Sequence, residues 1–450
     1  MNKSKKEFYP GKISFEIETL GPIRDSIVNF KPFLLFSGES NTGKSYTAMA
    51  VYYLFFMLNN GKKISELVRK FFDIKKNEND LKPKKEIELE LPKRLTKELE
   101  RLYNDNIGAF MAYMLGYEDF ACNIKLKLKI PPISDAKIHI YITQPKGEEW
   151  RINAEIESGF PELNKLYIAE KVRLTANNIE SICAFLLGDF CRMLVFRQME
   201  CSAFFLPPAR GTFSGLAPSM WKEISSIGIY NEFLKGVDSV RYSNFDIDEA
   251  LKEQKRFINP LFEKLLNGKI TVERDRESYK LIGSDKEIPL TAGSSSVKEL
   301  FPLYLLLNRV PIERLFICIE EPEAHLHPEL QRSTALLLSY IVNQGGFIQV
   351  TTHSDFFVNQ VNNLLKLHFI KNKEPNRFKK ILKEVGIQEE FVLDPKDMGN
   401  YYFEKVKDVV HVRELKASEN GMPLESFKHT YDQSVKETRN LREALTDDEK

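Results

Sequence analysis

Residues 38–45 read GESNTGKS and match the pattern G-x-x-x-x-G-K-[ST]. Glycines let a loop curl so that successive backbone N–H groups form a phosphate-sized nest, which the positive end of a following helix strengthens. Lys44 is then placed to reach the β and γ phosphates of a nucleotide, and the Ser45 hydroxyl to hold Mg²⁺. Because no NKxD guanine-reading motif is visible, ATP is favoured over GTP. The other residues that we expect to contact the nucleotide are Gly38, Asn41, Thr42, Gly43 and Thr47.

Two carboxylates follow the apolar run LFICI at residues 315–319. A buried strand places its last residues at the carboxyl edge of a sheet, where a phosphate-binding loop also lies. We therefore assign Glu320 to Mg²⁺ through a water molecule, and Glu321 to the attacking water as general base. Without the phosphate-binding loop, the same residues would describe an acidic loop after a core strand.

A histidine follows the next apolar run, FIQVTT, within the sequence TTHS at residues 351–354. At the end of a neighbouring strand, His353 can hydrogen-bond a γ phosphate and report its presence. A lone histidine is usually structural, but the two motifs above favour the functional role. His325 and His327 could be imagined as metal ligands; their place in a turn before a helix instead favours packing and hydrogen bonding beside a phosphate.

Small residues and hydroxyls precede a predicted helix in the sequence LTAGSSS at residues 290–296. Gly293, Ser294 and Ser295 are predicted to form a second anion site at the N-terminus of that helix. In the functional interpretation they touch the γ phosphate of a nucleotide held by another subunit. A plain helix N-cap explains the same residues equally well.

The elements that must position these residues alternate between strands and helices. Short apolar strands are predicted before the phosphate-binding loop at residues 33–36 and at LFICIE and FIQVTT, with helices at VKELFPLYLLL and at residues 328–342. This order indicates an α/β core. Other expected elements are a strand at residues 13–17, an antiparallel meander within 122–175, a hairpin at GKITVERDRESYKLIG, and short strands at 401–403 and 409–412.

Composition excludes several classes of protein. The 450 residues include 65 basic and 64 acidic side chains, a net charge of +1 and 42% hydrophobic residues, which is typical of globular proteins and not of disordered or fibrous ones. The near-zero net charge provides no overall basic footprint for nucleic acid. The longest apolar stretch, at residues 48–58, is shorter than the roughly 20 residues of a membrane helix. With five cysteines, no CxxC pair and no apolar signal core, we expect a cytoplasmic protein without a membrane partner.

Taken in order, these motifs resemble the ABC/SMC-like branch of P-loop ATPases, and most closely the AAA15 or OLD-like (overcoming lysogenization defect) ATPases. The resemblance lies in separate pieces, which are GPI at 21–23, GESNTGKS at 38–45, FLPPARG at 205–211, TAGSSSVKEL at 291–300, IEEPEAHLHP at 319–328 and TTHS at 351–354.

The resemblance implies that Gly293, Ser294 and Ser295 correspond to the ABC signature and that His353 is the switch histidine. Residues 324–328 would be the loop that crosses a dimer. Two ATP molecules with Mg²⁺ would be held between two heads, so that ATP binding closes the dimer and hydrolysis opens it. The segment lacks the second glycine and the glutamine of LSGGQ, and the first acid is Glu instead of Asp. Gln144 and Gln198 are both candidates for the Q-loop residue.

The domain organisation that follows has an ATPase head interrupted by a mixed helical and antiparallel-β insertion between the phosphate-binding loop and the signature. The expected parts are the N-terminal core at 1–60, a helical insertion at 61–120, a β meander at 121–175, a helical lid and hairpin at 176–285, the C-terminal core at 286–400 and an extension at 401–450.

OLD nucleases carry a Toprim domain after the ATPase, but the residues after His353 contain no EGxxD followed by DxD, so we expect no nuclease in this chain. The resemblance implies an ATP-hydrolysing switch that forms a homodimer or a larger homo-oligomer. Its role would be the sensor subunit of a bacterial antiviral defence or DNA-maintenance complex with a separate effector protein. The alternative is a nucleotide-locked scaffold with little turnover; a transporter ATPase fits less well. Basic clusters at 75–85 and 378–383 allow double-stranded DNA binding, although such clusters are more often solvated surface.

Overall fold

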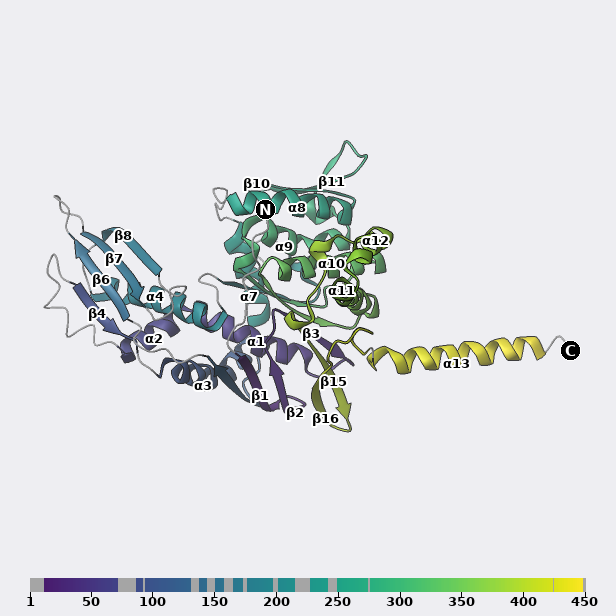
Figure 1. Cartoon of the computed structure of the whole chain (residues 1–450), viewed down its shortest axis with the longest axis horizontal. Helices are drawn as coiled ribbons and strands as arrows, with labels where there is room; N and C mark the ends of the chain where they lie inside the picture. The colour runs from purple at the N-terminus through teal and green to yellow at the C-terminus, as the bar shows by residue number, and fades with distance from the viewer. Residues whose placement is uncertain are drawn as a thin grey trace. The chain divides into compact units, whose positions relative to one another are not determined.

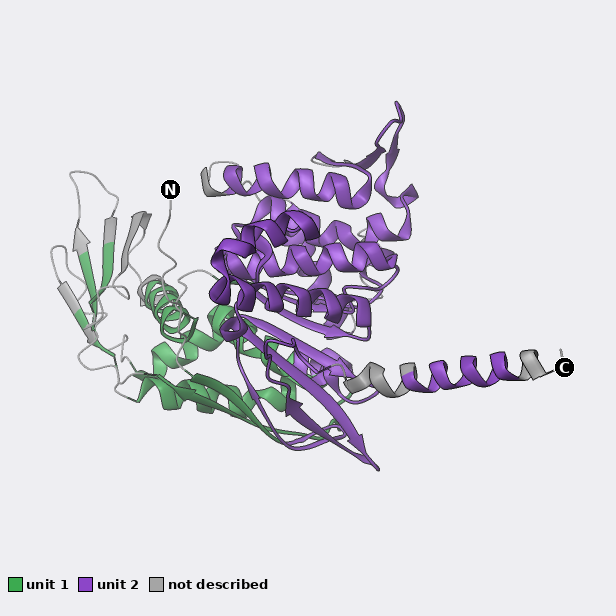
Figure 2. Ribbon diagram, turned by 45° about the vertical axis from the view of Figure 1, so that its right-hand side comes forward, with its two compact units in different colours: residues 1–17, 49–112, 117–203 green, residues 18–48, 113–116, 204–450 purple. Residues whose placement is uncertain are grey.

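The computed structural model describes residues 12–71, 86–91, 94–130, 137–143, 150–157, 165–172, 176–196, 201–214, 227–241, 249–273, 276–423 and 425–447. The chain divides into two compact units, coloured separately in Figure 2. The first unit is made of residues 1–17, 49–112 and 117–203, and the second of residues 18–48, 113–116 and 204–450. The phosphate-binding loop, the predicted signature, both acids and His353 all lie in the second unit.

The second unit is built on a sheet whose strand order includes β2-β16-β15-β3-β14-β13-β9 (Figure 1). Strand β3 pairs in parallel with β14 on one side and with β15 on the other, and β13 pairs in parallel with β14. The hairpin of β15 and β16 adds an antiparallel pair to this part of the sheet. The strands are Ile23–Asn29 (β2), Phe33–Gly38 (β3), Ser202–Leu206 (β9), Leu315–Glu320 (β13), Phe347–Thr352 (β14), Met398–Val406 (β15) and Val409–Glu414 (β16).

Continuous apolar runs explain why β3, β13 and β14 lie at the centre. All of their residues are buried, as expected of parallel strands covered on both faces. Alternate residues of each strand, among them Leu35, Ile317 and Val350, share one core with the neighbouring helices. The helices of this unit are Arg210–Ser214 (α5), Gly228–Arg241 (α7), Glu249–Leu266 (α8), Ser295–Arg309 (α9), Pro328–Asn343 (α10), Asp355–Lys373 (α11), Pro375–Val385 (α12) and Glu425–Asp447 (α13).

These elements confirm the predicted mixed α/β fold with a large, mostly parallel sheet. The predicted helix before the acidic strand is α9, and the strand itself is β13. The predicted hairpin is also present, because Gly268–Glu273 (β10) pairs antiparallel with Arg276–Leu281 (β11), to which Glu287–Pro289 (β12) adds a third strand. The predicted strands near the C-terminus form the hairpin of β15 and β16.

The first unit contains helices and a separate antiparallel sheet of order β4-β6-β7-β8. Helix Lys44–Asn59 (α1) begins in the second unit and continues into the first. The other elements are Lys12–Leu20 (β1), Gly61–Phe71 (α2), Glu86–Glu90 (β4), Leu95–Leu115 (α3), Cys122–Lys129 (β5), Lys137–Thr143 (β6), Trp150–Glu157 (β7), Lys165–Val172 (β8) and Ala176–Phe196 (α4).

Two expectations about this unit are corrected. Strand β4 lies inside the range that we expected to be helical, and it joins β6, β7 and β8. Strand β5 is not part of that meander, because it pairs with β1 at the edge of another sheet. Side chains of α3 cover its edge: the N–H of Leu126 donates to Asn104 Oδ1 at 2.8 Å and that of Leu128 donates to Glu100 Oε1 at 2.7 Å. These bonds satisfy N–H groups that a further strand would otherwise pair with.

All five cysteines are free thiols, and all except Cys122 are buried. Burial raises the pKa of Cys122 to about 11 and that of Cys183 to about 12, so these thiols stay protonated and poorly nucleophilic near neutral pH. Within the described ranges, no helix combines the length and the apolar character that crossing a membrane requires.

Candidate functional site

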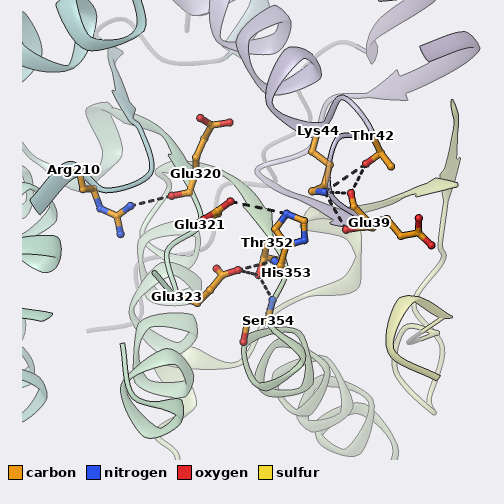
Figure 3. A network of polar contacts seen from close by, with 11 residues as sticks. Glu39, Thr42, Lys44, Arg210, Glu320, Glu321, Glu323, Thr352, His353 and Ser354 are labelled. Carbon is orange, nitrogen blue, oxygen red and sulfur yellow. Dashed lines mark hydrogen bonds and ion pairs between the residues drawn. The ribbon is translucent and has the colours of Figure 1, made fainter. Parts of the chain in front are cut away.

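Three adjacent parallel strands bring the predicted residues to one edge of the sheet. In the register, Glu320 of β13 lies opposite Thr351 of β14, and Thr352 lies opposite Ser37 of β3. The strands therefore end at the same level, and the loop after each strand contributes to the site. Figure 3 shows the side chains of the phosphate-binding loop, the acidic turn and the TTHS segment gathered at this edge.

Backbone conformation explains the two glycines of the phosphate-binding loop. Gly38 has a φ of +138°, and a Cβ atom there would lie 2.7 Å from the carbonyl oxygen of Phe403. Gly43 has a φ of +89°, and its Cβ would lie 2.8 Å from Cδ1 of Ile23. Asn41 between them also adopts a left-handed conformation, with φ of +61°. Larger residues at the two glycines would displace the loop, which accounts for their spacing in the sequence.

Lys44 lies over this loop and contacts its backbone. The ammonium Nζ donates hydrogen bonds to the carbonyl oxygens of Gly38 at 3.0 Å and Glu39 at 2.5 Å. Burial lowers the pKa of Lys44 to about 8, although the surrounding glutamates favour its charged form. A phosphate group in the nest would offer this desolvated cation stronger, charge-assisted hydrogen bonds than carbonyl oxygens do.

Two threonines of the predicted nucleotide contacts are buried in the loop and the following helix. Thr42 Oγ1 donates to the carbonyl oxygen of Glu39 at 2.7 Å, which helps to shape the nest. Thr47 Oγ1 donates to the carbonyl oxygen of Gly43, the residue just before α1, at 3.2 Å. The Thr47 hydroxyl thus stabilises the start of helix α1. Its contact with a nucleotide stays a prediction.

Glu320 and Ser45 have the chemistry of a Mg²⁺ site. Glu320 is buried at the end of β13, and a hydrogen bond from Ser45 joins its side chain to the phosphate-binding loop. Its Oε1 atom is buried and has no hydrogen-bond partner among the described residues. Burial raises the pKa of Glu320 to about 7, so its charge is poorly compensated. A hydroxyl and a carboxylate with an unused oxygen fit Mg²⁺, which takes few protein ligands and completes its shell with phosphate and water.

Glu321 and His353 face each other across the opening of the site. Glu321 has a φ of +45°, a strained conformation that its N–H stabilises by donating to the carbonyl oxygen of Thr351 at 2.9 Å. His353 Nε2 lies 4.0 Å from Glu321 Oε1, and both side chains are partly exposed. Burial and then Lys44 lower the pKa of His353, which favours the neutral imidazole. The pair can therefore offer a carboxylate and an imidazole to water or to a phosphate.

Glu323, the third acid of IEEPE, is a site residue that the sequence-based predictions did not include. Its Oε1 accepts hydrogen bonds from the Thr352 hydroxyl at 2.7 Å and from the His353 N–H at 2.6 Å. Burial raises the pKa of Glu323. Ser354, the residue after His353, caps helix α11 because its Oγ accepts a hydrogen bond from the Phe357 N–H at 3.1 Å. Glu323 thus fixes the backbone from which the His353 side chain projects.

The predicted signature residues start helix α9. Ser294 is the N-cap, and its Oγ accepts from the Val297 N–H at 3.4 Å. A Cβ atom on Gly293 would lie 3.0 Å from the Leu290 carbonyl oxygen, so the turn before the helix is tight. A cavity of about 310 Å³ opens beside this helix, lined by Gly211, Thr212, Thr291, Ser295, Lys298, Glu299 and His325.

A second residue absent from the sequence-based site predictions is Arg210, in the FLPPARG segment that belongs to the family resemblance. Its guanidinium is completely buried. Nη1 donates to the carbonyl oxygen of Glu320 at 3.0 Å, and Nε lies 3.5 Å from Oε2 of Glu299 in α9. An arginine after an apolar strand and two prolines was the available signal, but sequence alone does not show what such a residue contacts.

Several predicted features gain no support from the structure. Gln144, Gln198 and the basic cluster at 75–85 lie outside the described residues. In the other cluster, Lys380 lies 3.8 Å from Glu384, so its charge is partly compensated. Within the described ranges, no group of three or more His, Cys, Asp or Glu side chains is arranged to hold a metal ion.

Comparisons with known proteins agree with this geometry in part. Residues 223–358 match the family model AAA_15, an AAA ATPase domain; the matched range includes the signature segment, both acids and His353, but not the phosphate-binding loop. No curated protein sequence matches the chain.

Two solved structures illustrate the similarity at the level of structure. The SMC head domain from Thermotoga maritima aligns with a TM-score of 0.33 and 12% identity over 90% of this chain and 99% of that chain. The Smc head domain with an extended coiled coil bound to the C-terminal domain of ScpA, derived from Pyrococcus furiosus, aligns with a TM-score of 0.36 and 11% identity over 96% of this chain and 99% of that chain. Functional assignment therefore rests on the family match and on the geometry, which together support an ATP-binding P-loop ATPase.

Proposed function

We propose that the protein is an ATP-hydrolysing molecular switch in which two protomers enclose two ATP·Mg²⁺ molecules. The observation that carries the proposal is the convergence of Lys44, Glu320, Glu321 and His353 at one edge of the parallel sheet. Lys44 would hold the β and γ phosphates, and Ser45 with Glu320 would hold Mg²⁺. This set contains each kind of group that phosphoryl transfer to water requires.

Within this proposal, Glu321 would accept a proton from the attacking water while Lys44 stabilises charge on the phosphates. A Mg²⁺ ion held by Ser45 and Glu320 would add to this charge stabilisation. His353 contacts the γ phosphate and loses that contact when phosphate leaves. Because Glu323 holds the His353 backbone, the histidine stays in place while the nucleotide changes. ATP and ADP would thus differ in the contacts that they make at one edge of the sheet.

The second half of each site would come from the partner subunit. Ser294 and Ser295 lie at the N-terminus of α9 beside the cavity, together with Lys298 and His325. Hydroxyls, a helix N-terminus and a cationic side chain are suited to a phosphate. None of the residues that line the cavity belongs to the phosphate-binding loop. This separation supports composite sites, each with the loop of one protomer and the signature of the other.

Composite sites can be tested by mixing two inactive variants. Lys44→Ala removes the cation of the loop, and Ser295→Asp places a negative charge in the signature while favouring the helix N-terminus, so folding should be retained. In a mixed dimer, one site carries both changes and the other carries neither. We therefore expect equal mixing to restore up to about a quarter of wild-type turnover. Turnover that stays at the level of either variant alone would contradict composite sites.

For the cellular role, we infer a sensor subunit of a bacterial defence or DNA-maintenance complex that acts on a separate effector protein. A nucleotide-locked scaffold is the alternative, and two substitutions separate it from a switch. A scaffold should keep its biological function with Glu321→Gln and lose it with Lys44→Ala, whereas a switch should lose function with both. Adding double-stranded DNA to the turnover assay at low salt tests whether nucleic acid is the signal.

A further inference from the structure

Arg210 connects two parts of the second unit, the end of β13 and helix α9. In the proposed dimer, these two parts contribute to different nucleotide sites. Its Nη1 donates to the carbonyl oxygen of Glu320 at 3.0 Å and to that of Pro207 at 3.3 Å. Its Nε donates to the carbonyl oxygen of Glu299 at 3.0 Å. One buried side chain therefore connects the last residue of β13 with helix α9, as the dashed line to Glu320 in Figure 3 shows in part.

The stability of the fold does not by itself account for this pair. Arg210 and Glu299 are both almost completely buried, and burial lowers the pKa of Arg210. Removing two charges from water is unfavourable, and apolar replacements of buried ion pairs are often neutral or stabilising. A charged pair at this position is therefore better explained by what it connects.

Glu299 links Arg210 to the cavity beside the signature. Glu299 is one of the residues that line the cavity, and its Oε1 accepts a hydrogen bond from the Gly211 N–H at 3.1 Å. A Cβ atom on Gly211 would lie 2.9 Å from the backbone nitrogen of Glu299, so a glycine permits this close approach. A ligand in the cavity would therefore lie beside the same residue that Arg210 holds.

We propose that Arg210 is a positioning residue that couples the signature cavity of a protomer to the Mg²⁺-binding carboxylate of the same protomer. The inference rests on the composite sites of the proposed function. The γ phosphate of one ATP enters the cavity of the partner and shifts α9 through Glu299 and Ser295. Arg210 transfers this shift to the peptide of Glu320. Glu320 is the residue that would hold the metal of the second ATP. The two sites of a dimer therefore act cooperatively.

The test is the dependence of ATP turnover on ATP concentration for the full chain. We expect a wild-type Hill coefficient above 1, approaching about 2 for two coupled sites. Arg210→Lys keeps the charge but loses the planar fork of donors. It should lower the Hill coefficient to about 1. The affinity for a fluorescent ATP analogue is measured in the Glu321→Gln background. There, the Arg210→Lys protein should bind the analogue within about twofold of the protein that keeps Arg210.

A matched control is Arg192→Lys in the first unit. Arg192 is also a largely buried arginine, paired with Asp189, and its Nη1 donates to the carbonyl oxygen of Leu58 at 2.7 Å. This substitution should lower the melting temperature to a similar extent as Arg210→Lys and leave the Hill coefficient unchanged. If Arg210→Lys does not fold, Glu299→Gln serves in its place, because it neutralises the partner while preserving its shape, and the same loss of cooperativity is expected.

The possible results separate this inference from the proposed function. A wild-type Hill coefficient of 1, or a cooperative Arg210→Lys protein, overturns the coupling role even if ATP is hydrolysed. If the wild type binds ATP without hydrolysing it, the proposed hydrolysis fails. The same variants are then compared in binding isotherms, where cooperativity that is lost with Arg210→Lys supports the inference. Failure of the wild type to bind ATP overturns both.

Discussion

The backbone N–H of His353 donates a 2.6 Å hydrogen bond to the carboxylate of Glu323. The same carboxylate oxygen accepts from the Thr352 hydroxyl at 2.7 Å, so one side chain holds the segment that follows β14. Glu323 comes from the turn after β13, two residues beyond Glu321. The proposed base and the proposed switch histidine are therefore fixed relative to each other through the turn between them.

This arrangement predicts a positioning role for Glu323. Glu323→Ala would leave the Thr352 hydroxyl and the His353 N–H without their acceptor, at a cost of about 1–3 kcal/mol. We expect kcat to fall by about tenfold or more, with little change in ATP affinity. Glu323→Gln keeps a carbonyl oxygen at the same place and should restore most of kcat. Wild-type kcat in the alanine variant would show that the contact does not position His353 for turnover.

From the lowered pKa of Lys44 we predict that nucleotide affinity depends on pH. Its pKa of about 8 in the nucleotide-free protein means that the ammonium form is largely present at pH 7 and is lost as the pH rises above 8. Phosphates favour the ammonium form, so binding is accompanied by proton uptake above pH 8. We expect ATP affinity to decrease by up to about tenfold per pH unit above that value.

Binding isotherms between pH 6.5 and 9.5 would measure this effect, with Lys44→Ala as the control. The alanine variant should bind weakly with a flat profile over the same range. A wild-type affinity that does not change between pH 7 and 9.5 would contradict the role of Lys44.

From the burial of Glu320 we predict that the proposed metal site lowers the stability of the nucleotide-free protein. Its pKa is raised from 4.5 to about 7, so the folded state binds more protons than the unfolded state between these values. The free energy of unfolding therefore falls as the pH rises through this window, and the loss is complete above pH 7. Glu320→Gln removes the buried charge and should raise the free energy of unfolding by roughly 1–3 kcal/mol at pH 8.

Denaturant unfolding at pH 8 and at pH 5 would measure this difference, which should shrink at the lower pH. Glu321→Gln is the matched control, since Glu321 is partly exposed and its substitution should change stability little. Equal stability of wild type and Glu320→Gln at pH 8 would argue against a poorly compensated charge at the metal site.

Much of the second unit could be predicted because its signals are local. A buried parallel strand reads as a continuous apolar run, and β13 and β14 end where that run meets Glu320 and His353. The phosphate-binding loop is specified by two glycines whose positive φ and close neighbours disfavour any side chain. These features can be predicted without knowing which strands are neighbours, because the local sequence alone determines them.

The missed features depend on contacts between distant segments. Nothing near Arg210 in the sequence indicates that it reaches the Glu320 carbonyl, 110 positions away. Likewise, the alternation in β5 shows a strand but not its partner, and β5 pairs with β1 instead of β6. Register and partner choice are set by the packing of the whole unit, which periodicity does not report.

The central claim, that this chain hydrolyses ATP in sites completed by a second protomer, is tested most directly by steady-state ATP turnover against protein concentration. Glu321→Gln serves as the blank, and each series is run with and without double-stranded DNA. We expect turnover per protomer to rise cooperatively with protein concentration in the wild type and to be absent in the blank. Turnover at the level of the blank at every concentration, with or without DNA, would contradict the claim and leave a nucleotide-locked scaffold.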